Sequence, residues 1–410
     1  MEKTVPLRHV AALTGVVALL VVPAAAAGPH DVFRSELAGA LHAPHVSPAQ
    51  TGAVVFDLRT GQTVFAQNAG LALRPASNQK LATTYAALTA LGPSFRIETD
   101  VLGDGLQSGA TWRGNLVLKG YGDPALSGAK LVSLARQVAS AGIRHVSGRI
   151  LGDESWFDTR RIGVGWKAQF YLHESPALSA LIVNRGWTGR YETSRPALWA
   201  AQLFRLELRH EGVTVSGTAA VGAASANAVQ LAVVESPPLS ELVRHMDVYS
   251  DNFYAEMLLK EIGAVQGSRG SAAAGLAETR QLLAAAGVPL AGVRMVDGSG
   301  LSLLDRWTPR ALVSLLQAMW SDPDLEPYVV RALPIAGETG TLRDRMRTGP
   351  ARGVVRAKTG TTDNSSALSG FVGSRYVFSI LENGRPVRTR SAERSQNRFA
   401  EVLARAAASR

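Results

Sequence analysis

Cysteine is absent from the 410 residues of this chain. Its absence excludes every disulfide bond, and it excludes a lipoprotein-type anchor, which needs a cysteine to carry the lipid. A chain of this length buries a large hydrophobic core, so it does not depend on cross-links even in an oxidising compartment.

Metal-ligand patterns are missing as well. The eight histidines are scattered, only His42 and His45 lie close together, and no H-E-x-x-H sequence occurs. The glycine-rich stretch 120–124 lacks the spacing and the lysine of a phosphate-binding loop, so we interpret it as a turn. We therefore expect neither a metal nor a cofactor.

The apolar run near the N-terminus is too short to cross a membrane. It covers Val10 to Val22, about 13 residues, whereas a span needs about 20. Lys3 and Arg8 precede it and small residues follow, which is the pattern of a secretory signal peptide. We predict that residues 1–27 are removed and that the mature chain is exported to the periplasm or to the cell wall and extracellular space, with no transmembrane span. A retained membrane anchor is the alternative.

Acidic residues are fewer than basic ones, 33 against 43, which gives a formal net charge of +10. The arginines within residues 343–356 and 385–398 are spread through predicted loops and strands, and no nucleic-acid-binding module is recognisable. We therefore expect no nucleic-acid partner. A basic surface favours anionic cell-wall polymers or membrane lipid, and the sequence leaves both open.

The chain does contain a serine and a lysine at the start of a predicted helix. Ser77 and Lys80 are three residues apart, and an apolar stripe then recurs at helical spacing through Leu91. Residues at i and i+3 share one helix face, so the amine can reach the hydroxyl and act as its base. Alone this pattern is weak, because a capped helix with a solvated lysine has the same sequence.

Two further motifs follow in order, Ser250-Asp251-Asn252 and Lys358-Thr359-Gly360-Thr361. Each has a purely structural alternative, since the first can cap a helix and the second can be a strand that ends in a turn. The ordered trio S-x-x-K, S-D-N and K-T-G resembles the signature of penicillin-binding proteins and class A β-lactamases.

The surroundings narrow this resemblance. From about Val54 to about Asn383 the chain resembles the D-Ala-D-Ala carboxypeptidase/endopeptidase family, the class C low-molecular-mass penicillin-binding proteins. Residues 81–249 separate the first two motifs, as the long insertion does in this family, whereas class A β-lactamases place these motifs much closer. The other matching segments are Gly122-Asp123-Pro124, Asp297 to Ser302, Gly340-Thr341-Leu342 and Leu368-Ser369-Gly370.

The resemblance implies four catalytic residues. Ser77 is expected to be the nucleophile, and Lys80, in a partly neutral form, its base. Ser250 is expected to relay a proton to the departing amine, and Asn252 to hold Lys80 and the substrate amide. Burial and the nearby charge of Lys358 would both favour the neutral amine of Lys80.

The resemblance also implies a substrate-binding strand, formed by Lys358, Thr359, Gly360 and Thr361. The lysine and the threonine hydroxyls are expected to receive the terminal carboxylate of a peptide or of a β-lactam. The backbone N–H groups of Ser77 and Thr361 are expected to form an oxyanion hole.

For two other groups of residues, the sequence allows two interpretations each. Asp297 and Ser299 either lie close to the active site, as the resemblance implies, or build a tight turn. The aromatic segment Trp156-Phe157-Asp158 and Trp166 either shape a pocket for the peptide or pack, and we favour packing.

The pattern of elements predicts an α+β fold, a penicillin-binding/β-lactamase-like transpeptidase fold with an antiparallel sheet, helices and a β-rich inserted region. Strand-like runs at both ends, Val54 to Phe65 and Arg375 to Leu381, enclose a helical middle. We expect four parts, which are the signal peptide 1–27, the first catalytic part 28–94, one or two inserted domains in 95–236, and the second catalytic part 237–410. Helices are expected near 77–91, 130–141, 194–210, 252–263, 275–286, 308–320 and 398–408.

The function expected is that of a serine-type D-Ala-D-Ala carboxypeptidase/endopeptidase. It would act on peptidoglycan stem peptides through a Ser77 acyl-enzyme, and β-lactam antibiotics would inhibit it covalently. The alternatives are a β-lactamase and a non-catalytic peptidoglycan-binding protein. Against a β-lactamase, Glu256 and Glu261 have no E-x-x-x-N context and are interpreted as solvated or capping carboxylates.

Overall fold

A computed structural model describes residues 29–267 and 269–409. The predicted signal peptide, residues 1–27, lies outside the described residues. Within the described ranges, no helix is both long and apolar enough to span a membrane.

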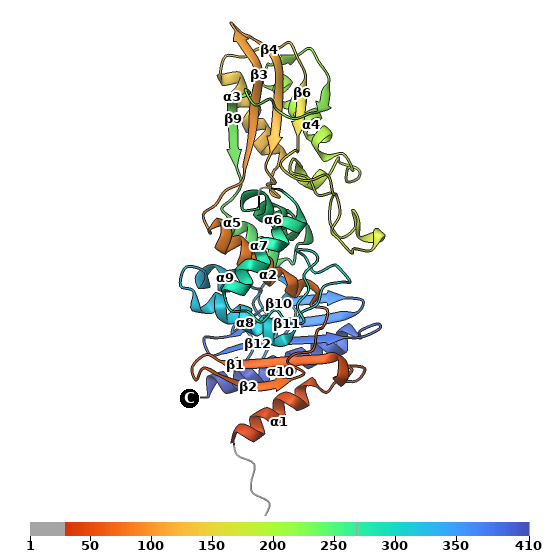
Figure 1. Ribbon diagram of the computed structural model, residues 1–410, viewed down its shortest axis with the longest axis vertical. Coiled ribbons are helices and arrows are strands. Elements are labelled where there is room, and N and C mark those ends of the chain that lie inside the picture. Colours follow the sequence, from red (N-terminus) through yellow and green to blue (C-terminus); the bar gives the residue numbers. More distant parts are fainter. Residues whose placement is uncertain (1–28, 268, 410) are drawn as a thin grey trace, which may run out of the picture.

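A five-stranded antiparallel sheet joins the two ends of the chain (Figure 1). Its strand order is β10-β11-β12-β1-β2, and β1 pairs with β12 from Thr51 opposite Glu382 to Asp57 opposite Tyr376. The strands are β1 (Thr51–Asp57), β2 (Gln62–Gln67), β10 (Val355–Thr362), β11 (Ser365–Val372) and β12 (Tyr376–Asn383). The antiparallel sheet predicted from strands at both ends is confirmed.

Successive side chains of β1 point to opposite faces of this sheet, and both faces are buried. Ala53 and Val55 pack in one hydrophobic cluster with Leu37 and Phe399, which come from α1 (Pro29–Leu41) and α10 (Thr389–Ala408). Val54 points the other way, into a cluster dominated by the central helices. Both faces are therefore covered by helices.

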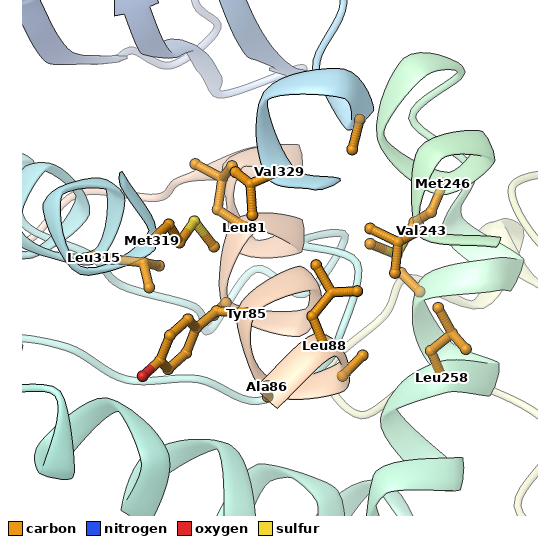
Figure 2. Packing of buried hydrophobic residues seen from close by; sticks show 14 of the residues in the cluster. Leu81, Tyr85, Ala86, Leu88, Val243, Met246, Leu258, Leu315, Met319 and Val329 are labelled. Carbon is orange, nitrogen blue, oxygen red and sulfur yellow. The ribbon is translucent and has the colours of Figure 1, made fainter. Parts of the chain in front are cut away.

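The helix that follows the first motif lies in the middle of the second cluster. Figure 2 shows Leu81 and Leu88 of α2 (Lys80–Leu91) among Met246, Leu315 and Val329 of the surrounding helices. The surrounding helices are α5 (Leu239–Val248), α6 (Asn252–Val265), α7 (Ala272–Ala285), α8 (Pro309–Ser321) and α9 (Glu326–Ala332). Because its neighbours enclose it, α2 holds its first residues in a fixed position.

A seven-stranded mixed sheet forms the opposite end of the molecule (Figure 1). Its core is a third cluster that includes Val101, Leu116 and Phe204. Two helices, α3 (Gly128–Ser140) and α4 (Pro196–His210), pack against each other and against this sheet. Its strands are β3 (Glu98–Ser108), β4 (Thr111–Gly120), β5 (His145–Val146), β6 (Ile150–Asp153), β7 (Thr214–Val215), β8 (Ala219–Val221) and β9 (Val229–Glu235).

Five short 3₁₀ turns complete the elements assigned in the described residues. They are η1 (Pro48–Gln50), η2 (Ala76–Gln79), η3 (Ala168–Phe170), η4 (Asn184–Gly186) and η5 (Gly340–Leu342). The second of them carries Ser77, so the predicted helix from Ser77 begins as a 3₁₀ turn and becomes α-helical at Lys80.

The C-terminal helix departs from the sequence prediction. It begins at Thr389, well before the predicted residue 398. Ser395 and Gln396 lie on its buried face and hydrogen-bond Glu382, and Gln396 also bonds Ser366. Because polar residues occupy core-facing positions, the apolar periodicity of this first part is hidden in the sequence.

Candidate active site

Ser77 lies at the entrance of α2, within reach of Lys80. Lys80 Nζ donates a hydrogen bond to Ser77 Oγ at 3.0 Å. The preceding residue, Ala76, has a left-handed backbone with φ of +45°. The Ser77 hydroxyl caps neither η2 nor α2. The structural alternative, a serine that only caps a helix, therefore does not describe Ser77.

The turn that carries Ser77 is fixed by three distant segments. Asn78 Nδ2 donates to the Lys358 carbonyl at 3.0 Å, and Trp307 Nε1 donates to Gln79 Oε1 at 2.6 Å. A Cβ added to Gly360 would lie 2.8 Å from the Pro75 carbonyl oxygen and 3.1 Å from Ser77 N. Glycine at position 360 thus lets strand β10 approach the backbone of the serine closely.

Lys80 is fully buried and makes three hydrogen bonds. Besides Ser77, its amine donates to Asn252 Oδ1 and to the Ser299 carbonyl, both at 2.8 Å. Burial lowers the pKa of Lys80 to about 8, against the opposing effect of nearby carboxylates, of which Asp297 is the strongest. About a tenth of the amine is therefore neutral at pH 7, far more than for an exposed lysine, and this fraction can act as a base for Ser77.

The S-D-N motif forms the junction between α5 and α6. Ser250 has a left-handed backbone with φ of +57°, an uncommon conformation for a residue with a side chain. Asp251 caps α6 by accepting from Tyr254 N at 3.2 Å, so the capping interpretation holds for this one residue. Asn252 is the first residue of α6 and faces Lys80.

Asp251 is held as a carboxylate by two neighbours. Arg185 Nη1 lies 2.7 Å and His245 Nε2 3.3 Å from Asp251 Oδ2. Burial raises the pKa of Asp251, but the hydrogen bonds from His245 and Arg185 outweigh it and bring the pKa to about 2. The turn around Ser250 is thereby anchored to the segment near Arg185.

The K-T-G-T motif runs along β10, and its lysine faces Ser250. Lys358 Nζ donates to Ser250 Oγ at 2.8 Å, and the side chain is fully buried. Burial lowers the pKa of Lys358, and the charge of Lys80 lowers it further. Thr359 Oγ1 donates to Thr341 Oγ1 at 2.7 Å. The strand continues to Thr362, so the predicted turn lies beyond the motif.

All eight predicted site residues therefore meet in one region. Ser77, Lys80 and Asn252 form one hydrogen-bonded chain, and Ser250 and Lys358 form another. Thr359, Gly360 and Thr361 extend beside them on β10.

Asp247 is a residue of this region that sequence reasoning missed. It is fully buried in the last turn of α5 and accepts from Thr84 Oγ1 at 2.6 Å. Burial raises its pKa, while the charges of Lys358 and Lys80 act in the opposite direction. The available signal was a carboxylate four residues after Val243, on the apolar stripe of an amphipathic segment.

Asp297 and Ser299 combine the two roles that the sequence left open. Asp297 accepts from the backbone N–H groups of Gly300 and Ser302, both at 2.7 Å, and so builds a tight turn. The same turn presents the Ser299 carbonyl to Lys80. Trp166 Nε1 donates to Asp297 Oδ2 at 2.7 Å. Packing alone therefore does not describe Trp166.

The aromatic segment at 156–158 does behave as predicted. Phe157 is buried in the central cluster, and Trp156 packs at its edge. Asp158 pairs with the buried Lys260 at 2.6 Å.

A small cavity adjoins the end of β10. Its volume is about 100 Å³, and Thr361, Leu301 and Phe170 contribute to its walls. Lys167 Nζ and Asp363 Oδ2, 2.6 Å apart, form an ion pair at its rim. Asn252 Nδ2 donates to the Glu174 carbonyl at 3.2 Å, so the segment 166–174 touches both the S-D-N motif and the turn at Asp297.

The interpretation of Glu256 and Glu261 as solvated or capping carboxylates is wrong, because both lie within α6 and bond other segments of the chain. Both side chains are buried on α6. Glu256 Oε1 accepts from the backbone N–H groups of Gly298 and Ser299, at 3.0 and 2.9 Å, and burial raises its pKa. Glu261 accepts from Trp156 Nε1 at 2.9 Å, and burial raises its pKa to about 8. Both are structural groups of the core.

Within residues 29–267 and 269–409, no group of three or more histidine, aspartate or glutamate side chains is arranged to hold a metal ion. The expectation of no metal and no cofactor stays a prediction.

The sequence signature of the D-Ala-D-Ala carboxypeptidase 3 (S13) family matches residues 33–193 and 189–406. The chain belongs to this family. The D-alanyl-D-alanine carboxypeptidase of Actinomadura sp. strain R39 is 32% identical over 86% of this chain and 81% of its own length. Carboxypeptidase DacB of Mycolicibacterium smegmatis is 31% identical over 88% of this chain and 83% of its own length.

Solved structures agree with the fold. Penicillin binding protein 4 from Haemophilus influenzae superimposes with a TM-score of 0.80 at 22% identity, over 91% of this chain and 98% of that protein. A predatory peptidoglycan endopeptidase from Bdellovibrio bacteriovorus gives a TM-score of 0.57 at 16% identity, over 87% and 92%. The predicted fold class, an α+β penicillin-binding fold with an antiparallel sheet, is confirmed.

Membership of the S13 family also confirms the resemblance drawn from the motifs. The predicted enzyme class, a serine-type D-Ala-D-Ala carboxypeptidase, is confirmed with it.

Proposed function

We propose that this S13 enzyme is exported and cleaves the terminal D-Ala of peptidoglycan stem peptides, or the cross-links between them, through an acyl-enzyme on Ser77. The observation that carries the proposal is the 3.0 Å hydrogen bond from the buried amine of Lys80 to the Ser77 hydroxyl. A lysine in this setting serves as a base because burial brings its pKa to about 8.

The first step forms one bond and moves one proton. Neutral Lys80 takes the proton of Ser77 while Ser77 Oγ attacks the carbonyl carbon between the two D-Ala residues. The backbone N–H groups of Ser77 and Thr361 would hold the resulting oxyanion, a role supported by the close approach of Gly360 to Ser77 N. Asn252 holds Lys80 in place through its Oδ1.

The second step breaks the peptide bond. Ser250 passes a proton to the departing amine, and D-Ala leaves. The C–N bond breaks as the amine takes the proton of Ser250, and the proton that Lys80 took from Ser77 replaces it, so Lys80 is neutral again. Lys358, 2.8 Å from Ser250 Oγ, keeps its own proton and with it the positive charge for the terminal carboxylate. Water then hydrolyses the ester on Ser77.

Substrate binding and base activation are coupled through the two lysines. A carboxylate beside Lys358, with Thr359 and Thr361, favours the charged form of that amine. The charge of Lys80 lowers the pKa of Lys358, and because repulsion between two cations is mutual, a charged Lys358 in turn disfavours a second charge on Lys80. Arrival of the substrate carboxylate thus promotes the neutral base.

β-Lactams would follow the same first step and stop there. Glu256 already accepts two backbone N–H groups, and Glu261 bonds Trp156, so neither is placed to orient water for rapid hydrolysis of a penicilloyl ester. We therefore expect inhibition. One related structure, of Haemophilus influenzae penicillin binding protein 4, is described as a complex with a β-lactam.

Fluorescent penicillin tests the proposal and its alternatives together. The full chain is labelled, and release of the label is followed beside release of D-Ala from a stem-peptide mimic. We expect a label that lasts minutes or longer and turnover of the peptide. Rapid multiple turnover of penicillin without D-Ala release indicates a β-lactamase, and no label with retained binding to peptidoglycan indicates a non-catalytic binding protein.

A further inference from the structure

A second cavity, of about 420 Å³, is lined with arginine side chains. Its volume lies in the range of small-molecule sites. Arg74, Arg306 and Arg385 form its polar wall, and no aspartate or glutamate contributes to it. The remaining lining residues are Ser47, Gln50, Ala72, Asn383 and Gly384.

Two of these guanidinium groups meet at one carbonyl oxygen. Arg74 Nε donates to the Leu303 carbonyl at 3.1 Å, and Arg306 Nη1 donates to the same oxygen at 2.9 Å. A guanidinium carries five N–H donors, so each group keeps further donors beyond this shared contact. Two guanidinium cations therefore lie side by side, and each has N–H groups that this shared contact does not use.

The charge of this cluster is poorly compensated. Among residues 29–267 and 269–409, no carboxylate forms an ion pair with Arg74, Arg294, Arg306 or Arg385. Burial lowers the pKa of Arg306, the charges of Arg74 and of Arg294, which lies outside the lining, lower it further, and Asp305 acts in the opposite direction.

Asp305 is the carboxyl that opposes the positive charge of Arg306. Burial, with the adjacent Asp297, raises the pKa of Asp305 well above the usual value. Its charged form is therefore disfavoured, which limits how far it offsets the three lining arginines.

The cluster is held by a rigid frame. Asn383 Oδ1 accepts from Arg74 N at 2.8 Å, and Asn383 Nδ2 donates to the Arg74 carbonyl at 3.1 Å. Arg294 and Arg306 exchange two backbone hydrogen bonds of 2.8 Å. The fold thus keeps like charges that repel one another close together.

We propose that this arginine cavity binds the phosphate group of a phosphate monoester or diester. Guanidinium forks match the paired oxygens of phosphate better than they match any neutral ligand. The basic net charge of +10 would attract such anions from a distance.

Leu303 connects the arginine cavity to the active site. The Leu303 carbonyl receives Arg74 and Arg306, while Leu303 lines the small cavity beside Thr361. A phosphate-bearing polymer held by the arginines would therefore lie near the substrate strand. Binding itself requires neither Ser77 nor the proposed peptidase activity, so the two proposals fail separately.

Calorimetric titration of the full chain with inorganic phosphate and with glycerophosphoglycerol, a small phosphodiester, tests the proposal. We expect saturable binding of one equivalent. Arg385→Gln removes an exposed lining residue and should weaken binding about 10-fold or more. Arg74→Lys keeps the positive charge but loses the paired N–H donors of the guanidinium, and it should weaken phosphate binding as well. Unchanged penicillin labelling of Arg385→Gln verifies its fold.

Arg113→Gln provides the matched control, because Arg113 is an exposed arginine on β4 of the other sheet. It should leave phosphate binding unchanged. A preference for phosphate identifies a monoester or the free ion as the ligand, and a preference for glycerophosphoglycerol identifies a diester. The proposal is overturned by no saturable binding, by equal weakening in Arg113→Gln and Arg385→Gln, or by succinate binding as tightly as phosphate.

Discussion

Lys80 and Lys358 are both fully buried, and each donates to a serine hydroxyl, Lys80 to Ser77 and Lys358 to Ser250. Two full positive charges in one dry region repel each other, so burial and mutual repulsion favour at least one neutral amine. Asp247, buried beside both, offsets part of this repulsion. Burial and repulsion between the two amines thus allow a lysine to act as a base near neutral pH.

The rate of acylation by penicillin should depend on pH through Lys80. Its pKa of about 8 lies below the usual value, so the neutral base is scarce at pH 6 and dominant above pH 8. We expect the second-order rate constant to rise with pH toward about pH 8 and to fall at higher pH, because Lys358, whose pKa burial lowers to about 7, then loses the charge that holds the carboxylate. Stopped-flow measurement from pH 6 to 9.5 checks this profile.

Lys80→Ala should acylate far more slowly and lose this rising limb. Lys358→Ala should mainly weaken binding, because its amine faces the expected carboxylate position. A profile independent of pH in the wild type, or a rising limb retained in Lys80→Ala, contradicts the assignment of the base.

At the scale of elements, the site depends on how closely strand β10 approaches the turn at Ser77. The contact at Gly360 involves backbone atoms, which do not yield as a flexible side chain does. Gly360→Ala should separate strand and turn by a few tenths of an ångström and slow acylation about 10-fold or more, since small misplacements of reacting groups are costly. Pre-steady-state labelling with penicillin measures the effect.

Gly39→Ala is the matched control for this substitution. Gly39 lies in α1, and a Cβ there meets no atom within 4 Å. It should leave acylation unchanged and stabilise the helix slightly. Equal rates in Gly360→Ala and the wild type would show that the close approach is unimportant.

Local signals in the sequence predict many elements and fail for others. The helix α8 was predictable because Thr308 caps it, accepting from Ala311 N at 3.1 Å, and Pro309 begins it. The start of α10 was not, because Ser395 and Gln396 are polar and buried. Asp247 was missed for the same reason.

Local sequence patterns also do not predict which distant residues meet in the site. Asn252 meets Lys80 across 172 residues, a pairing that only the motif resemblance indicated. The contacts of Trp166 with Asp297 and of Asn252 with Glu174 depend on how a loop of the inserted region folds back, and no spacing in the sequence encodes that.

For the whole molecule, we propose that residues 28–94 and 237–410 form a catalytic domain and that 95–236 form an inserted one. The proposal is supported by the seven-stranded sheet and by its own hydrophobic cluster, which draws its buried residues from positions 101–232. The loop near Trp166 connects the two parts at the active site.

A substitution that creates a cavity in the core of the inserted part tests this division into two domains. Phe204 is fully buried there, so Phe204→Ala should destabilise the inserted part by about 3–5 kcal/mol. Hydrogen exchange should show lost protection in β3 and β4, while β10 and β11 stay protected and penicillin labelling at 25 °C persists. Parallel loss of protection in both sheets would indicate one cooperative unit.

Mapping of the penicillin adduct tests the central claim, that Ser77 is the nucleophile, most directly. Mass spectrometry of the labelled protein should show one penicilloyl group, carried by the peptide that contains Ser77. Ser77→Ala should carry none and yet stay folded, since its hydroxyl caps no helix and the substitution costs about 1 kcal/mol or less. An adduct on Ser250 or on any other residue, or one that persists in folded Ser77→Ala, would contradict the account.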